Sequence, residues 1–213
     1  MERAITPRRP ASVEHGVDAA GRLLPHPAWP TDRAAPGELE LVRRFCNSLN
    51  RENGADRFAT SAGLDRWLAS EGLPAVRAGR DSIERVRSVR EALHELTASN
   101  RERRPATDAW LRFARAVGKA SFVLQPQADG LTLVPRARSA TDVFLARLAL
   151  ICIRAAGDGT LDRLKACAHC EWTVYDSSKN RSGRWCGVCG GRHNARMYRQ
   201  RKAATTAPAG RRR

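Results

Sequence analysis

The spacing of apolar residues divides the chain from residue 38 to residue 157 into helical segments. Apolar side chains recur every three or four positions, as they do on the buried face of an amphipathic helix. Four such stretches are residues 38–50, 61–72, 81–100 and 105–117. A fifth, residues 141–157, is apolar enough to be the central helix, with Ser139 or Thr141 as its N-cap.

Two other segments follow different patterns. SFVLQPQADGLTLV (residues 121–134) has two short apolar runs around a turn that contains Asp129-Gly130, which predicts a β-hairpin. Residues 1–36 hold six of the eleven prolines and no sustained periodicity, which predicts a mostly disordered arm. The pattern therefore indicates a mainly α domain with a small β-hairpin over residues 37–160.

Four of the six cysteines fall within residues 167–189, CAHCEWTVYDSSKNRSGRWCGVC, as two C-x2-C pairs that are fifteen residues apart. Each pair can point two thiolates at one spot, and two pairs supply the tetrahedral sulfur cage that zinc prefers. A redox thiol pair and an Fe–S cluster are the alternatives. We predict one structural Zn2+, with these ligands: Cys167, Cys170, Cys186 and Cys189. Cys46 and Cys152 stand alone in apolar helical patterns and are interpreted as small buried hydrophobes.

The residues around the cysteines predict the rest of a small module over residues 163–203. Residues 172–175, WTVY, alternate as a strand does, and residues 176–180 are turn formers, so a hairpin between the two pairs would bring them together. Gly190-Gly191 would then allow a sharp start to a basic helix, with Ala195, Met197 and Tyr198 available for packing. Residues 204–213 would be a disordered basic tail.

The positive charge is concentrated at the same end of the chain. The net charge is +16, of which residues 163–213 contribute +11. A concentrated positive field suggests a polyanion partner, and duplex DNA is the partner we predict. The candidate nucleic-acid contacts are Lys179, Arg181, Arg184, Arg192, Arg196 and Arg199. The last three lie at positions i, i+4 and i+7 of the predicted helix and share a face that can follow phosphates; a solubilising tail or a solvated helix face is the alternative.

No enzyme signature is present. Phosphate-binding glycine loops, nucleophile elbows and HExxH are all missing from the sequence, and His94 has no obvious acid partner. We therefore expect a protein without catalytic activity. The N-terminal sequence has no apolar signal region, and the longest apolar run, residues 148–153, is far too short to span a bilayer. We expect a cytoplasmic protein with no membrane partner.

Two stretches resemble known families. CEWTVYDSSKNRSGRWCGVCGGRHNARMYRQR resembles the CGNR zinc finger, although the signature reads Cys189-Gly190-Gly191-Arg192, with Gly191 in place of the family's Asn. LELVRRFCNSLNRENGADRFATSAGLDRWLASEGL resembles the ABATE domain that precedes this finger in bacterial proteins. The resemblance covers about residues 36–202. It implies a zinc-dependent, DNA-binding transcription regulator whose helical domain is a sensor or interaction domain. We expect such a protein to be nucleoid-associated.

The main hypothesis is therefore a DNA-binding regulator with a C-terminal four-cysteine zinc finger made of a β-hairpin and a basic helix. The alternatives are a zinc-stabilised module that binds an acidic partner protein, and an enzyme with its site in the helical domain. A small-molecule effector and a homodimer partner stay open, as do the DNA sequence recognised and the sign of regulation.

Overall fold

The structure, a computed structural model, describes residues 34–74, 79–118, 121–128, 130–137 and 139–206. Its helices are α1 (Leu39–Cys46), α2 (Ser61–Ser70), α3 (Arg80–Glu102), α4 (Thr107–Val117), α5 (Ala140–Gly157), the 3-10 turn η2 (Leu161–Arg163) and α6 (Gly187–Thr206). Its strands are β1 (Leu49–Asn50), β2 (Ala55–Asp56), β3 (Ser121–Gln127), β4 (Gly130–Arg136), β5 (Leu164–Ala166) and β6 (Thr173–Tyr175). The predicted fold class, mainly α with a C-terminal finger, is confirmed. Most of the predicted arm and tail lies outside the described residues.

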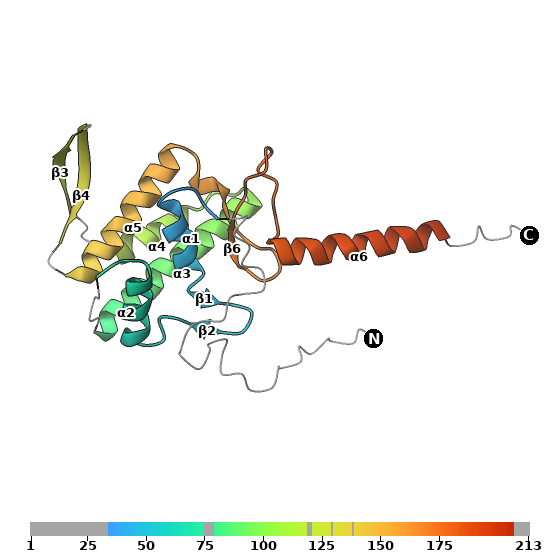
Figure 1. The fold of residues 1–213 in the computed structure, drawn as a ribbon, viewed down its shortest axis with the longest axis horizontal. Coiled ribbons are helices and arrows are strands. Elements are labelled where there is room, and N and C mark those ends of the chain that lie inside the picture. The colour runs from blue at the N-terminus through green and yellow to red at the C-terminus, as the bar shows by residue number, and fades with distance from the viewer. Residues whose placement is uncertain (1–33, 75–78, 119–120, 129, 138, 207–213) are drawn as a thin grey trace, which may run out of the picture.

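Helices α1 to α5 enclose one hydrophobic core, and α5 runs through it (Figure 1). Four aromatic rings, from Phe45, Phe58, Trp67 and Phe144, pack at centroid distances of 5.4 to 6.0 Å. Of the two residues predicted as the N-cap of α5, Ser139 is the cap: its hydroxyl accepts a hydrogen bond from the Asp142 backbone N–H. No helix in the described part of the chain is long and apolar enough to cross a membrane.

The two cysteines outside the cluster are core residues, as predicted. Cys46 and Cys152 are at most 1 % exposed. Burial raises the pKa of the Cys46 thiol to about 12, and it also raises the pKa of Cys152. Both side chains are therefore neutral packing groups rather than reactive thiols.

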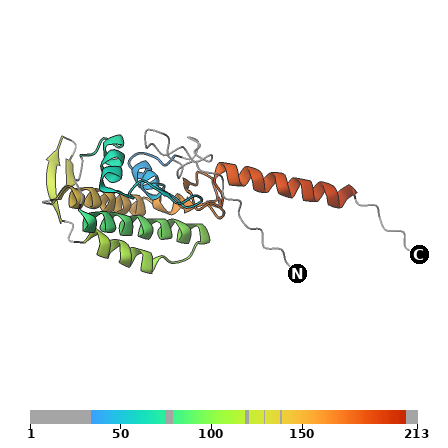
Figure 2. The ribbon, with the colours of Figure 1, turned by 90° about the horizontal axis from the view of Figure 1, so that it is seen from below.

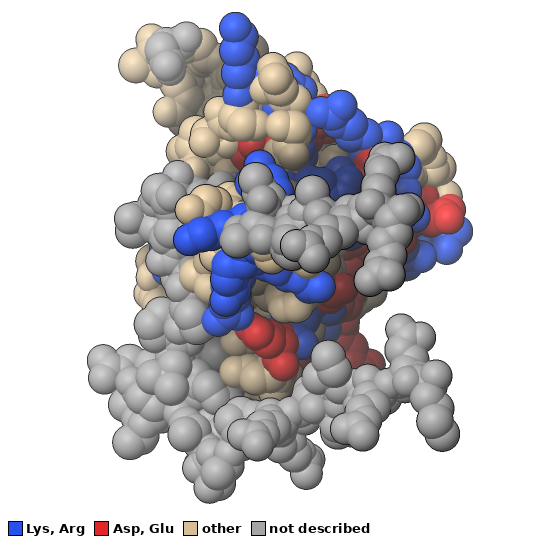
Figure 3. Space-filling view, turned by 90° about the vertical axis from the view of Figure 1, so that its right-hand side faces the viewer, with Lys and Arg blue, Asp and Glu red and all other residues tan. Residues whose placement is uncertain are grey.

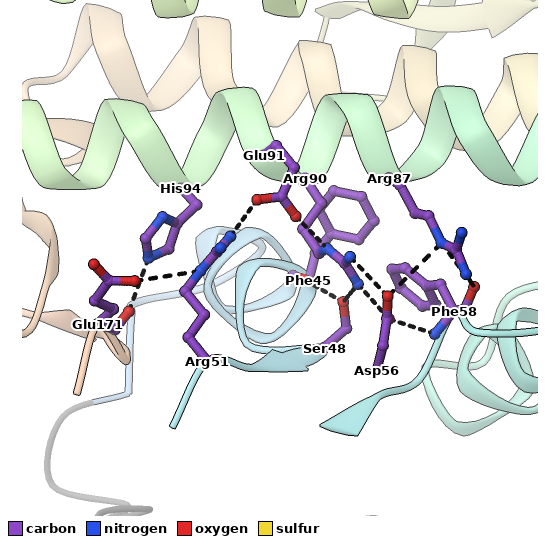
Figure 4. Close-up of polar contacts among 10 residues, drawn as sticks. All are labelled: Phe45, Ser48, Arg51, Asp56, Phe58, Arg87, Arg90, Glu91, His94 and Glu171. Carbon is purple, nitrogen blue, oxygen red and sulfur yellow. Dashed lines mark hydrogen bonds and ion pairs between the residues drawn. The ribbon is translucent and has the colours of Figure 1, made fainter. Parts of the chain in front are cut away.

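The first helix is shorter than predicted, because the chain turns into a small hairpin. α1 ends at Cys46, and Leu49–Asn50, which the pattern placed in the helix over residues 38–50, pairs with Ala55–Asp56 instead. Arg90 of α3 holds this hairpin: its guanidinium bonds both carboxylate oxygens of Asp56, at 2.5 and 3.0 Å, and lies over the Phe58 ring (Figure 4). The apolar period of the sequence continues through Leu49, so the end of the helix is set by tertiary contacts and not by the local pattern.

The β3–β4 hairpin and α6 lie at opposite ends of the molecule (Figures 1 and 2). The hairpin falls where the sequence predicted it, with Gln127 opposite Gly130 at its turn. The helical core separates it from the four clustered cysteines. The module that carries those cysteines therefore lies at the end of the molecule opposite the β3–β4 hairpin.

Candidate zinc centre and basic helix

The four predicted ligand cysteines come together in space. Their sulfur atoms all lie within 4.8 Å of one another, and all four residues are buried. The Sγ atoms of Cys170 and Cys186 are 3.7 Å apart. A tetrahedral zinc with bonds of about 2.3 Å separates its sulfur ligands by about 3.8 Å, so the spacing fits the metal. The cluster is the site of one structural zinc.

The thiol chemistry also fits a metal cation. Burial and the neighbouring Cys186 thiol raise the pKa of Cys189 to about 12. Hydrogen bonds from Cys170 and Cys186 act in the opposite direction and lower the pKa of Cys167. Four thiolates so close together repel one another, and a divalent cation removes that repulsion. Zinc would hold all four sulfurs as thiolates and link the two ends of the module.

The first cysteine pair forms the turn of a hairpin, which corrects the predicted topology. Leu164–Ala166 pairs with Thr173–Tyr175, so the two strands flank the first pair instead of lying between the pairs. The turn is closed by the Cys167 N–H, which donates to the Trp172 carbonyl at 2.8 Å, and by Glu171 in the left-handed conformation, at φ 59°. The predicted return strand does not form because the residues after 175 make a different structure.

Those residues, 176–185, form a loop that is organised around the carboxylate of Asp176; we call it the anchored loop. Asp176 accepts hydrogen bonds from the Ser178 and Gly183 backbone N–H groups, at 3.0 and 2.8 Å, and from the Lys165 ammonium at 2.8 Å. Burial by itself would raise the pKa of Asp176, but these donors hold it well below its usual range. A side chain at Gly183 would meet this carboxylate, because its Cβ would lie 2.8 Å from the Asp176 Cγ.

Sequence reasoning did not identify this ion pair. Asp176 was assigned only to a turn, and Lys165 was given no role within the module over residues 163–203. Both side chains are at most 4 % exposed, and the pair ties strand β5 to the anchored loop. The Asp-x-Ser spacing of an Asx turn was a usable signal for Asp176, but nothing nearby in the sequence indicates its buried lysine partner.

The hairpin of the finger is docked on the helical domain through its backbone. The Asn47 side chain donates to the Thr173 carbonyl and accepts from the Thr173 N–H, both at 2.8 Å. His94 of α3 donates from Nε2 to the Glu171 carbonyl at 2.9 Å, and Arg51 approaches the Glu171 carboxylate at 4.0 Å (Figure 4). His94 thus helps to hold the first cysteine pair against α3.

Helix α6 is different, because it leaves the body of the molecule after the second cysteine pair (Figures 1 and 2). The sequence predicted that Gly190 and Gly191 would precede the helix. The helix instead begins at Gly187, so both glycines lie within its first turns. Met197 is 39 % and Tyr198 is 62 % exposed, so the prediction that they pack is wrong. In the first turns of α6, the His193 ring stacks on Trp185 of the anchored loop, at 4.3 Å between ring centroids.

The six predicted nucleic-acid contacts divide into two groups. On α6, Arg192, Arg196 and Arg199 are exposed and make no ion pair with any described residue; we call them the basic face. The second group lies in the anchored loop. Lys179 is exposed, and the two arginines of this group, Arg181 and Arg184, have acidic neighbours. Arg181 lies 3.9 Å from Asp162, and Arg184 lies 3.4 Å from Glu102.

Figure 3 looks at the end of the molecule from which α6 projects. Lys and Arg side chains gather around this end, and Asp and Glu side chains lie lower and to the right in the view. No acidic residue follows Asp176 in the sequence, so nothing within α6 offsets its positive charge. The field is therefore most positive along the projecting helix.

This arrangement defines a helical domain that carries a zinc-bound, basic C-terminal module. The family model described as "CGNR zinc finger" matches residues 163–202. The model described as "Putative stress-induced transcription regulator", the ABATE domain, matches residues 39–159, which is more than half of the chain. The chain therefore belongs to the ABATE family and ends in a CGNR zinc finger, as its sequence suggested. No curated protein matches it.

Proposed function

We propose that the protein is a DNA-binding transcription regulator in which zinc fixes the start of α6 and α6 contacts the duplex. The observation that carries the proposal is the basic face: three exposed arginines on a helix that projects from the body and has no acid along its length. An α-helix fits the major groove of B-DNA, and arginines along it can bond phosphates or guanine edges. A DNA partner would place the protein at the nucleoid, in the cytoplasm.

The roles of the basic residues differ in this proposal. Arg196 and Arg199 lie further along α6 and follow the phosphate backbone. Arg192 lies close to the zinc centre, where the helix is fixed best, and it is our candidate for reading a base. Arg181 and Arg184 contribute less, because Asp162 and Glu102 compete with phosphate for them.

The zinc in this proposal is structural. Four thiolates fill a tetrahedral zinc and leave no coordination position for a substrate, so we propose a binding protein and not an enzyme. The second candidate is a module that binds an acidic protein through the same arginines. The exposed basic face supports it equally well, and the two candidates differ in their response to duplex DNA.

The test is a titration of the zinc-loaded chain with a duplex at several salt concentrations. Six phosphate contacts would give a slope of log K against log salt of about −5. If Arg181 and Arg184 stay paired with their acids, four contacts remain and the slope is about −4. No binding to DNA at low salt would reject the proposal and favour an acidic protein partner.

Single substitutions then separate phosphate contacts from base contacts. Arg196→Ala should reduce the slope by about 1 and weaken specific and random duplexes alike. Arg192→Ala should cost about 1–3 kcal/mol on the preferred duplex only. Equal losses on both duplexes for both variants would remove Arg192 from base reading and leave the phosphate contacts in place.

A further inference from the structure

The β3–β4 hairpin has one face made entirely of apolar residues. Residues opposite each other in an antiparallel pair point to the same side, and the sides alternate along the strand. The three alternate pairs on this face are Phe122–Pro135, Leu124–Leu133 and Pro126–Leu131. The other face is mixed: it carries the polar pairs Gln125–Thr132 and Ser121–Arg136 and the apolar pair Val123–Val134.

The apolar face is turned away from the protein. Leu124 is 66 %, Leu131 is 69 % and Leu133 is 40 % exposed. On the other face, Thr132 accepts a hydrogen bond from Arg154 of α5 at 3.2 Å, so that face is the one toward the body. An isolated two-stranded hairpin is marginally stable in water, and three exposed leucines side by side add a cost that a partner would remove.

The face, and not the strand edges, is suited to a partner. Each strand of the hairpin contains one proline, Pro126 in β3 and Pro135 in β4. Proline has no N–H and is a common device for keeping a free edge from pairing with another strand. A partner would therefore pack against the apolar face, as two sheets pack in a sandwich at a distance of about 10 Å.

We infer that the partner is a second copy of this chain, packed face to face through the β3–β4 hairpin about a two-fold axis. Such a contact joins the same patch on both copies, so the patch must be compatible with itself. The chain carries a net charge of +16, and most pairs of its surfaces would repel. The apolar face has no charged side chain, so contact between two copies there places no like charges directly against each other.

The position of the hairpin agrees with this pairing. It lies at the end of the molecule opposite α6 in two perpendicular views (Figures 1 and 2). Two copies joined at this end keep their basic helices apart, whether or not those helices bind DNA. The dimer contact is therefore independent of the proposed function and can be tested without DNA.

The experiment is sedimentation equilibrium of the full zinc-loaded chain over a range of concentrations. The test variant is Leu124→Thr with Leu131→Thr, because threonine keeps the strand propensity and removes exposed apolar surface. The matched control is Leu111→Gln on α4, which changes a leucine that is 49 % exposed away from the hairpin. Thermal unfolding at a concentration where all three proteins are monomeric checks that the test variant folds as the wild type does.

We expect a concentration-dependent dimer for the wild type and the control, and a dissociation constant at least about tenfold higher for the test variant. A wild type that stays monomeric up to about 100 μM would overturn the inference, since a weaker dimer is irrelevant at cellular concentrations. A dimer of unchanged affinity in the test variant would also overturn it, because the contact would lie elsewhere. A monomer that floats with phosphatidylcholine vesicles, and loses this in the test variant, would identify a lipid surface as the occupant instead.

Discussion

The two ends of the zinc finger are held by different interactions. The β5–β6 hairpin is fixed to the helical domain by side-chain bonds from Asn47 and His94 to its backbone, and its Lys165 is tied to the anchored loop by a buried ion pair with Asp176. Helix α6 has an exposed surface over most of its length and is joined to the rest through the cysteine cluster and its first turns. The hairpin is in effect part of the helical domain, and the zinc attaches α6 to it.

This difference gives the zinc a specific mechanical role. A helix that is polar on all sides has no core to stabilise it, and short isolated helices are marginal in water. The zinc anchors the N-terminal turn of α6, and the docked hairpin determines the direction in which the helix leaves the body. Breaking the metal site should therefore affect α6 far more than the helical domain.

The largest expected effect comes from the double variant Cys186→Ser with Cys189→Ser. An incomplete cage loses most of a zinc binding free energy that reaches about 10–16 kcal/mol in zinc-finger peptides. Metal analysis should find one zinc per wild-type chain and almost none in the variant, and circular dichroism should show a loss of helix that corresponds to α6. The helical domain should still unfold cooperatively.

Cys152→Ala is the matched control, because Cys152 is a buried core residue and not a ligand. It should keep its zinc and its helix content, although it unfolds at a lower temperature. Full zinc occupancy in the double variant would contradict the assignment of the ligands. Collapse of the whole chain on removal of zinc would contradict the independence of the two ends.

The next largest effect is expected at Asp176. Removal of one partner from a buried ion pair costs about 3–5 kcal/mol, because the other charge stays buried alone. Asp176→Ala should lower the free energy of unfolding by about this amount, with Lys165 as the charge left unpaired. Asp162→Ala removes an exposed partner of Arg181 and should cost less than about 1 kcal/mol. Urea unfolding at pH 7 measures both, and equal effects would show that the anchored loop does not depend on its buried carboxylate.

Asp176 also predicts a pH dependence. Its pKa in the folded protein lies below the value of about 3.9 for an unfolded aspartate, so the unfolded state binds more protons between the two values. Its stabilising contribution should be complete above about pH 5 and should be lost as the pH falls through 4 toward the folded pKa. The difference in stability between wild type and Asp176→Asn should shrink over this range. Zinc loss in acid affects both proteins and largely cancels in the difference.

A smaller effect is expected at the docking contact. Asn47→Ala leaves the N–H and the carbonyl of Thr173 without their partner, and each unpaired buried group costs about 1–3 kcal/mol. The free energy of unfolding should fall by about 2–4 kcal/mol, and the Thr173 amide should exchange faster with deuterium. Asn53→Ala, in the turn between β1 and β2, is the control and should cost less than about 1 kcal/mol. Unchanged exchange at Thr173 would show that the hairpin is held by other contacts.

The sequence predicted those features that depend on local patterns. Helices α2 to α5 follow from their apolar period, the β3–β4 hairpin from Asp129-Gly130 between apolar runs, and the metal site from cysteine spacing. These signals lie within a few residues of the element that they predict. The same is true of Cys46 and Cys152, whose burial follows from the stripe in which each lies.

The features that were missed depend on residues far apart in the sequence. α1 ends early because Asn47 bonds Thr173, 126 positions away, and the β1–β2 hairpin depends on Arg90. β5 is three residues long and contains a lysine, so neither its length nor its composition indicates a strand. The expected packing of Met197 and Tyr198 failed for the opposite reason: apolar residues were present, but both side chains are exposed, with no described helix or strand packed over them.

The smallest predicted effect concerns the competition between acids and DNA at the anchored loop. Arg184 lies 3.4 Å from Glu102 at the end of α3, whereas the basic face has no such partner among the described residues. Glu102→Gln keeps the size of the side chain and removes its charge, so Arg184 becomes available to a phosphate. The slope of log K against log salt should become steeper by up to about 1, and the affinity should rise at low salt. Glu95→Gln is the control, because Glu95 pairs with Arg112 of α4, away from the finger. If both variants change the slope equally, the effect comes from net charge alone and Arg184 is not a contact. If neither variant changes the slope, Arg184 bonds phosphate while still paired with Glu102. In that case the two groups of arginines do not differ as proposed.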